Sequence, residues 1–144
     1  MKLYKILIAI ILSSYSLVAT AAEGKWTKGF GQGNLEYFID KGNTRLYIGC
    51  PSEESNNGGY VSVDFLVDSK FVKSFKIQVD GRTYHGPFNS GTRNGSNDVI
   101  GLIDDLQKTD AKVVYGANTF VFPKSNVSKI LQTYKSGKLA CAFN

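Results

Sequence analysis

The sequence is poor in the residues that build metal centres and disulfide-dense scaffolds. Its 144 residues include 2 cysteines and 1 histidine, which are too few for a closed zinc site. Only 3 residues are proline, 42% are hydrophobic and 20% are charged. This composition is that of an ordinary globular protein, and it excludes a disordered chain, a collagen-like repeat and a coiled coil. The length suits a single domain.

Long apolar stretches are also scarce, and the most continuous one lies near the N-terminus. Two lysines precede the apolar residues 6–12, and the small residues 19–22 follow after a mixed stretch. This order predicts a secretory signal peptide over residues 1–22, cleaved after Ala21 or Ala22. The apolar run is shorter than the roughly 20 residues of a transmembrane helix. We therefore expect no stable membrane anchor after cleavage, the alternative being an uncleaved one.

Predicted export changes the expected charge of the chain and its expected partners. Loss of the two N-terminal lysines lowers the formal net charge from +5 to +3. A chain so close to neutral has no strong attraction to nucleic acid. We expect no nucleic-acid partner and no cofactor, and we expect a periplasmic or secreted location.

Predicted export also suggests how the two cysteines are used. In an oxidising compartment, two cysteines in one small domain usually form a disulfide. A bridge between Cys50 and Cys141 would close a loop of about 90 residues, worth up to about 4–5 kcal/mol by chain entropy. A reactive or intermolecular thiol is the alternative, but the sequence has no Cys-x-x-Cys motif to support it.

Alternating apolar and polar residues predict a β-rich domain. Residues 23–34 are rich in glycine and predict a flexible lead-in, followed by a single β-rich domain over residues 35–144. Turn residues at 41–43, 80–81 and 116–118 predict three hairpins. The predicted strands cover residues 35–40, 44–50, 60–68, 71–80, 82–84, 111–115 and 119–122. We expect Phe71 to share the buried face of its strand with Phe75.

Two short helices complete the prediction. The first covers residues 98–108, with Asn97 as its N-cap and with Asp104 and Asp105 facing solvent. The second covers residues 126–134. The fold class is mainly β with two short helices (α+β), as a small antiparallel β-sandwich or partly open barrel with one disulfide.

Residues with catalytic potential are few. A Ser-His-Asp or Cys-His centre would have to use His85, because it is the only histidine. Neither Ser90 nor Ser96 lies in a nucleophile-elbow motif. The adjacent carboxylates Glu53 and Glu54 do not face each other across a cleft, as a glycosidase pair must. We therefore predict a non-enzymatic protein, and we keep a hydrolase that uses His85 as an alternative.

Two polar loops are the candidate partner-binding segments. Loops on a rigid scaffold often bind partners, although a plain solvated loop is the simpler interpretation. The candidate residues are Glu53, Glu54, Asn56 and Asn57 in the first loop, and His85, Phe88, Arg93 and Asn94 in the second. The acidic first loop suits a cationic partner.

The order of these segments resembles a known family. A strand of residues 46–50 ends in Cys50, alternating strands and a short helix follow, and then come Tyr115-Gly116, Pro123-Lys124-Ser125 and Ala140-Cys141. This arrangement resembles the TagO-like periplasmic accessory proteins of type VI secretion. More loosely, it is similar to the invasion-associated locus B family of exported β-rich proteins. The resemblance covers residues 35–143 and implies a non-enzymatic, exported, β-sandwich-like domain with a Cys50–Cys141 bridge.

These observations lead to one expected function and several alternatives. We expect an exported module that binds another protein and serves a bacterial envelope or secretion system. A periplasmic inhibitor or immunity protein that blocks a cell-wall hydrolase is the alternative. A binder of a small molecule on the concave face of the sheet is a further class, for which no residue specifies a ligand.

Overall fold

The computed structural model describes residues 23–31, 34–51 and 60–131. The strands are β1 (Thr27–Gly31), β2 (Asn34–Lys41), β3 (Thr44–Pro51), β4 (Ser62–Val67), β5 (Lys70–Phe71), β6 (Phe75–Val79), β7 (Arg82–Gly86), β8 (Phe88–Asn89), β9 (Ala111–Tyr115) and β10 (Asn118–Phe122). The helices are α1 (Arg93–Leu106) and α2 (Val127–Ile130). Within the described ranges, no helix is long and apolar enough to cross a bilayer.

The strands form two antiparallel sheets. Sheet A has six strands in the order β1-β2-β3-β4-β5, and β8 pairs with β4 beside this path. Sheet B has four strands in the order β10-β9-β6-β7. Neither order closes on itself, so the described strands do not form a closed barrel. The fold is mainly β with two helices, which confirms the predicted α+β class.

Local turn chemistry explains the hairpins. The three predicted hairpins join β2 to β3, β6 to β7 and β9 to β10. A fourth tight turn joins β4 to β5 through Asp68 and Ser69, whose φ angles are 50° and 62°. Short polar residues tolerate this left-handed conformation better than most non-glycine residues. The sequence predicts residues 60–68 and 71–80 as two separate strands. In the structure the second segment is divided, because Phe71 ends β5 in sheet A and β6 lies in sheet B.

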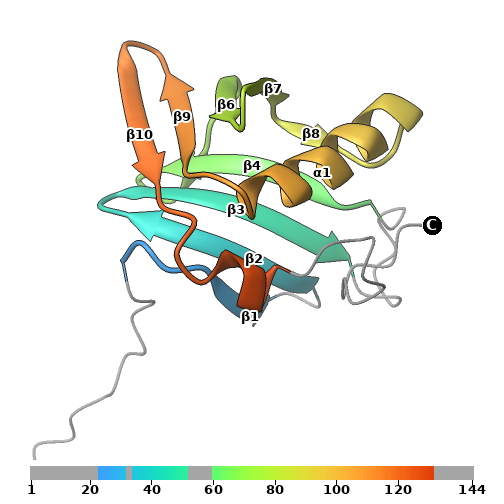
Figure 1. Cartoon of the computed structure of the whole chain (residues 1–144), viewed down its shortest axis with the longest axis horizontal. Coiled ribbons are helices and arrows are strands. Elements are labelled where there is room, and N and C mark those ends of the chain that lie inside the picture. The colour runs from blue at the N-terminus through green and yellow to red at the C-terminus, as the bar shows by residue number, and fades with distance from the viewer. Residues whose placement is uncertain (1–22, 32–33, 52–59, 132–144) are drawn as a thin grey trace, which may run out of the picture.

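The core lies between the two sheets. Sheet A contributes Tyr37, Ile39, Leu46, Ile48, Val63 and Phe65, with Val61 just before β4, sheet B contributes Phe75, Ile77, Val79, Tyr84, Val113 and Phe122, and α1 contributes Val99, Leu102, Ile103 and Leu106. Helix α1 contacts β6 and β8 and lies on the same side of sheet A as sheet B (Figure 1). Each sheet therefore has one face in the core and the opposite face directed away from it.

The predicted flexible lead-in needs correction, because it belongs to the folded domain. Residues 27–31 form β1, which pairs with β2 from Thr27↔Phe38 to Gly31↔Asn34. Trp26 is only 2% exposed, as expected of a packing anchor. The backbone N–H of Trp26 donates to Asn126 Oδ1 at 2.8 Å, and Asn126 Nδ2 donates to the Trp26 carbonyl at 2.9 Å. A contact 100 residues away along the chain thus orders a segment whose own sequence looks loose.

The first helix also begins earlier than predicted. It starts at Arg93 with Thr92 as its N-cap, whose hydroxyl accepts from the Gly95 N–H at 3.0 Å. The predicted cap, Asn97, lies inside the helix. A Cβ at Gly95 would collide with the backbone oxygen of Asn89, so glycine allows the first turn to pack against β8.

Two predicted orientations are wrong. Asp105 is fully buried rather than solvent-facing, because basic and phenolic groups surround its carboxylate. Phe71 is 63% exposed rather than buried with Phe75, because the chain leaves sheet A after β5 and enters sheet B at β6. The alternation within 71–80 therefore holds only for β6.

The predicted disulfide lies partly outside the described residues. Cys50 is 1% exposed and faces the core near the end of β3. Cys141 is not among the described residues, so the Cys50–Cys141 bridge stays a prediction. The second predicted helix, residues 126–134, lies within the described residues only up to residue 131. This part contains α2, with Val127 buried at its first position and Leu131 buried just after its end.

Candidate functional site

The face of sheet A that points away from the core carries the most organised set of side chains. We call it the outer face of sheet A. Side chains alternate along each strand, so the neighbours of the core residues lie on this face. The residues are Glu36, Phe38 and Asp40 on β2, Arg45 and Tyr47 on β3, Ser62, Asp64 and Leu66 on β4, and Phe71 on β5. Except for exposed Phe71, all are half-buried.

Arg45 is held by two different contacts. Its Nε and Nη2 donate to the two carboxylate oxygens of Asp40 at 2.6 and 2.8 Å. Its guanidinium carbon lies 3.9 Å from the centre of the Phe38 ring. The hydrogen bond to Asp40 is the main reason that the pKa of Arg45 is raised. A bidentate pair combined with stacking on an aromatic ring fixes a planar cation in one orientation.

Tyr47 is fixed on the same face. Its hydroxyl donates to Glu36 Oε1 at 3.0 Å, and its ring meets Phe71 edge-on, with centroids 6.2 Å apart. A Cβ added at Gly49 would lie 2.9 Å from Tyr47 Cε1, so the absence of a side chain there makes room for the ring. Burial, followed by the hydrogen bond to Glu36, raises the pKa of Tyr47. The phenol therefore stays neutral and donates.

Carboxylates outnumber cations on this face. Asp64 lies opposite Tyr47 in the strand register. Burial raises the pKa of Asp64, and a hydrogen bond with Ser62 partly offsets this. Among the described residues, the face carries the carboxylates of Glu36, Asp40 and Asp64 and one guanidinium, that of Arg45. It is therefore an acidic, aromatic surface.

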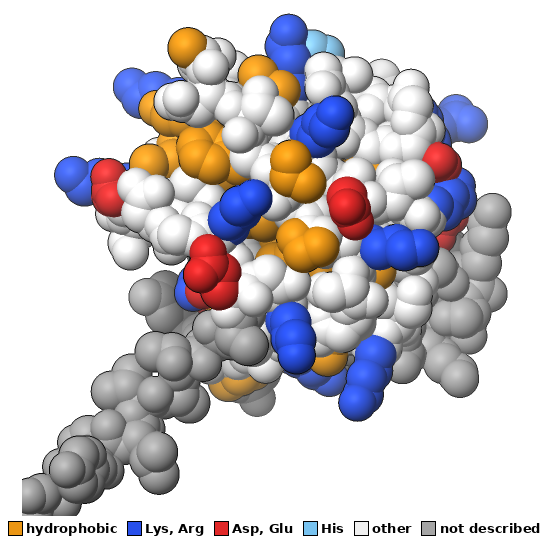
Figure 2. Space-filling view, turned by 60° about the vertical axis from the view of Figure 1, so that its left-hand side comes forward, with side chains coloured by type: hydrophobic (Ala, Val, Ile, Leu, Met, Phe, Trp, Pro, Cys, Tyr) orange, Lys and Arg blue, Asp and Glu red, His pale blue; other side chains and the backbone are white. Residues whose placement is uncertain are grey.

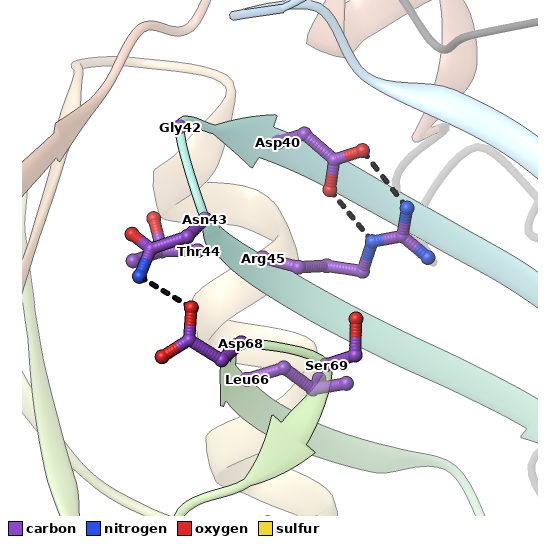
Figure 3. A pocket seen from close by; sticks show the side chains of 8 residues that line it. All are labelled: Asp40, Gly42, Asn43, Thr44, Arg45, Leu66, Asp68 and Ser69. Atoms are coloured by element: carbon purple, nitrogen blue, oxygen red, sulfur yellow. Dashed lines mark hydrogen bonds and ion pairs between the residues drawn. The ribbon is translucent and has the colours of Figure 1, made fainter.

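A hollow of about 480 Å³ lies at one end of the outer face of sheet A, between the β2–β3 and β4–β5 turns. Figure 3 shows the side chains that line it, with the Asp40–Arg45 pair on one wall. On the other wall, Asn43 Nδ2 donates to Asp68 Oδ1 at 2.8 Å. The hollow thus continues the outer face around the edge formed by Arg45 and Leu66.

The sequence-predicted site residues do not form one site. Glu53, Glu54, Asn56 and Asn57 lie outside the described residues. Phe88 belongs to β8 and stacks on Tyr84, with centroids 6.1 Å apart. Arg93 and Asn94 are exposed in the first turn of α1 rather than in a loop.

His85 lies apart from these residues. It is exposed on β7, opposite Lys76 of β6, on the face of sheet B that points away from the core. Among the described residues its ring makes no hydrogen bond. Ser90 is engaged elsewhere, because its hydroxyl accepts from the Val61 N–H at 2.9 Å. The described geometry therefore provides no general-base pair around His85.

The second predicted loop lies close to Tyr60. A Cβ at Gly91 would lie 3.3 Å from the ring of Tyr60, and Tyr60 is 50% exposed. The second predicted loop therefore borders the point at which the chain enters β4. In the part of the chain that the structure describes, no three His, Cys, Asp or Glu side chains gather to hold a metal ion.

Sequence reasoning missed the outer face of sheet A. Its signal was present, because Phe38 and Tyr47 occupy the solvent-side positions of amphipathic strands, where polar residues are usual. Their meeting with Arg45 and Glu36 depends on the cross-strand register. A single strand pattern does not contain that register.

Comparison with known proteins assigns relatives to the chain. The sequence model of a family described as YfjT matches residues 24–131. The chain is 31% identical over 140 residues to the uncharacterized protein YkfB of Escherichia coli strain K12, covering 88% of this chain and 89% of that protein. It is 30% identical over 131 residues to the uncharacterized protein YfjT of the same strain, covering 82% and 84%. No solved structure matches the chain.

Proposed function

The chain belongs to the YfjT family, and we propose that it is an exported, non-enzymatic module that binds another protein through the outer face of sheet A. The single observation that carries the proposal is the ordered layer formed by Phe38, Arg45 and Tyr47 on an otherwise solvent-directed sheet. Tyrosine and arginine are enriched among the residues that dominate binding energy at protein interfaces.

Preorganisation supports this role. Arg45 is fixed by Asp40 and Phe38, and Tyr47 is fixed by Glu36. Side chains that are already held in place lose less conformational entropy when a partner binds. The Arg45–Asp40 pair is partly exposed, and such pairs contribute only modestly to stability, so its ordering is of most use in binding.

The charge of the face indicates the kind of partner. The carboxylates of Glu36, Asp40 and Asp64 favour a protein with a basic surface, because complementary charge speeds association and excludes unsuitable partners. The opposite, outward face of sheet B carries Lys76 and Lys112 instead. The two faces thus differ in charge, and a basic partner would select the outer face of sheet A.

Two versions of this function differ in the identity of the partner. In the first version, the protein is an accessory module of an envelope or secretion system, as the TagO-like resemblance predicts. In the second version, it is an inhibitor or immunity protein, and an acidic face suits a basic cell-wall hydrolase. Export through residues 1–22 and the Cys50–Cys141 bridge belong to both versions of the proposal.

Affinity capture from envelope extracts tests the proposal. The protein carries a C-terminal tag, and an outer-face variant, Arg45→Ala with Tyr47→Ala, is compared with a control, Lys76→Ala with Thr83→Ala, on the outward face of sheet B. We expect the wild-type and control proteins to retain a partner that the outer-face variant loses. Circular dichroism checks that all three proteins are folded.

Each outcome of the capture experiment has a meaning. One dominant hydrolase identifies an inhibitor, and co-purified secretion or envelope components identify an accessory module. Capture that is unaffected by the Arg45 and Tyr47 substitutions contradicts the proposed face. The absence of any captured protein contradicts the binding role, and the hydrolase alternative is then tested by comparing wild type with His85→Ala on peptidoglycan and ester substrates.

A further inference from the structure

A second surface, at the end of the molecule that carries the β9–β10 hairpin, is apolar and exposed. Phe71 is 63% exposed and Tyr115 is 38% exposed. They line one open groove of about 510 Å³ together with Val67, Val72, Lys70, Lys73 and Ser74. We call these residues the end patch. Figure 2 brings this end forward and shows apolar side chains exposed there, with both basic and acidic side chains around them.

The end patch lies in a basic part of the chain. Of the residues that line the groove, Lys70 and Lys73 are the charged ones, and none is aspartate or glutamate. The neighbouring carboxylate of Asp68 accepts a hydrogen bond from Asn43 and lines the separate hollow beside the β2–β3 turn. The apolar groups of the groove are therefore flanked directly by two flexible cations.

We propose that the end patch docks reversibly on a bilayer surface that carries anionic phospholipids. Exposed aromatic and aliphatic side chains that stand beside lysines match the interface between lipid headgroups and acyl chains. Lysine stems lie along apolar surface while their ammonium groups reach the headgroups. Each lysine near an anionic membrane adds to the attraction.

The kind of cation in the end patch favours a lipid partner over a protein partner. Protein interfaces are enriched in arginine and depleted in lysine, whereas the end patch contains lysine alone as its cation. The outer face of sheet A shows the opposite pattern, with one arginine stacked on an aromatic ring. The two surfaces therefore suit different partners, and the end patch suits lipid.

The proposed docking needs no membrane anchor. Phe71 and Tyr115 project from β5 and β9, which belong to different sheets. Both rings reach the headgroup region without unfolding, so binding is peripheral and falls with increasing salt concentration. The outer face of sheet A borders the end patch at Phe71, and anionic headgroups would repel its carboxylates, so we expect docking to leave that face turned away from the bilayer.

Vesicle co-sedimentation tests the proposal with protein purified in the form that cells accumulate. The vesicles contain phosphatidylglycerol with phosphatidylethanolamine, and vesicles of phosphatidylcholine serve as the neutral comparison. We expect binding to the anionic vesicles alone, weakened about tenfold or more by Lys70→Glu with Lys73→Glu, since each lysine near an anionic surface strengthens binding about fivefold. The control, Lys28→Glu with Lys129→Glu, reverses two exposed charges elsewhere and leaves binding unchanged.

A fluorescence experiment reports insertion directly. Phe71→Trp is expected to show a blue shift of emission with anionic vesicles, whereas Tyr60→Trp at the opposite end is not. Trp26 is buried and adds the same background to both variants. Equal binding to neutral vesicles, no binding to anionic vesicles, or unchanged binding of the Lys70/Lys73 variant overturns the proposal. These assays contain no second protein, so their result is independent of the capture experiment.

Discussion

The hydroxyl of Tyr84 on β7 donates to Asp105 Oδ2 on α1 at 2.6 Å, at a site where the aspartate is fully buried. Arg82 Nη2 and Lys108 Nζ reach the other oxygen at 2.6 and 3.0 Å. The carboxylate thus joins the helix to sheet B. A buried charge persists in a protein only when partners of this kind surround it.

Asp105→Asn is expected to lower the free energy of unfolding by about 2 kcal/mol, because a neutral amide weakens the buried hydrogen bonds from Tyr84 and Arg82. Urea denaturation of the two proteins measures this difference. Asp98→Asn, at an exposed position of the same helix, serves as the control and is expected to leave stability unchanged. Equal effects of the two substitutions would contradict the role given to Asp105.

The same carboxylate predicts a pH dependence of stability. Burial alone would raise the pKa of Asp105, but hydrogen bonds from Arg82, Tyr84 and Lys108 lower it below the ordinary 3.8. A group with a lowered folded-state pKa stabilises the fold above its unfolded-state pKa, and this contribution is lost as pH falls through the folded-state pKa. The stability difference between wild type and Asp105→Asn should therefore shrink below about pH 4. A difference that stays constant down to acidic pH would contradict this assignment.

Asp64 is expected to behave in the opposite way. Burial raises its pKa, so the ionised carboxylate is less favourable in the folded than in the unfolded state. Asp64→Asn should therefore increase stability at neutral pH, and the increase should diminish as pH falls through the raised pKa. Thermal denaturation at neutral and acidic pH measures both values. A loss of stability at neutral pH would contradict this account.

Asn126→Ala is expected to destabilise the fold by about 1–3 kcal/mol, because it removes two hydrogen bonds to the backbone of Trp26. The fluorescence of Trp26 should shift to longer wavelength as the ring becomes more exposed. Ser128→Ala, at an exposed position in α2, provides the control. If neither stability nor fluorescence changes, the N-terminal segment does not depend on Asn126.

Gly49→Ala is expected to cost about 1–3 kcal/mol through overpacking against the ring of Tyr47. The cost should be smaller in a protein that already carries Tyr47→Ala, because the clashing ring is then absent. A double-mutant cycle measured by urea denaturation reports this coupling. Purely additive effects would show that the two positions do not interact.

Local features of the sequence predicted much of the β architecture. The turns at 41–43, 80–81 and 116–118 have their own chemistry, so three hairpins followed from short segments. Alternation in β4 and β6 identified the buried faces, including Val63 and Ile77. These features were predictable because each depends on residues close together in the chain.

Features that depend on distant contacts were not predictable in the same way. Strand β1 is ordered by Trp26 and Asn126, and the start of α1 depends on the fit of Gly95 against Asn89. The burial of Asp105 requires groups from β7. The candidate site shows the same limit, because the outer face of sheet A arises from the register that sets β2 against β3.

Photo-crosslinking in cells tests the proposed binding face most directly. A photoreactive phenylalanine analogue replaces Phe38 on the outer face of sheet A in one protein and His85 on the outward face of sheet B in another. The proposal predicts a discrete crosslinked protein from position 38 and none from position 85. A crosslinked protein from position 85 with none from position 38 would contradict the account.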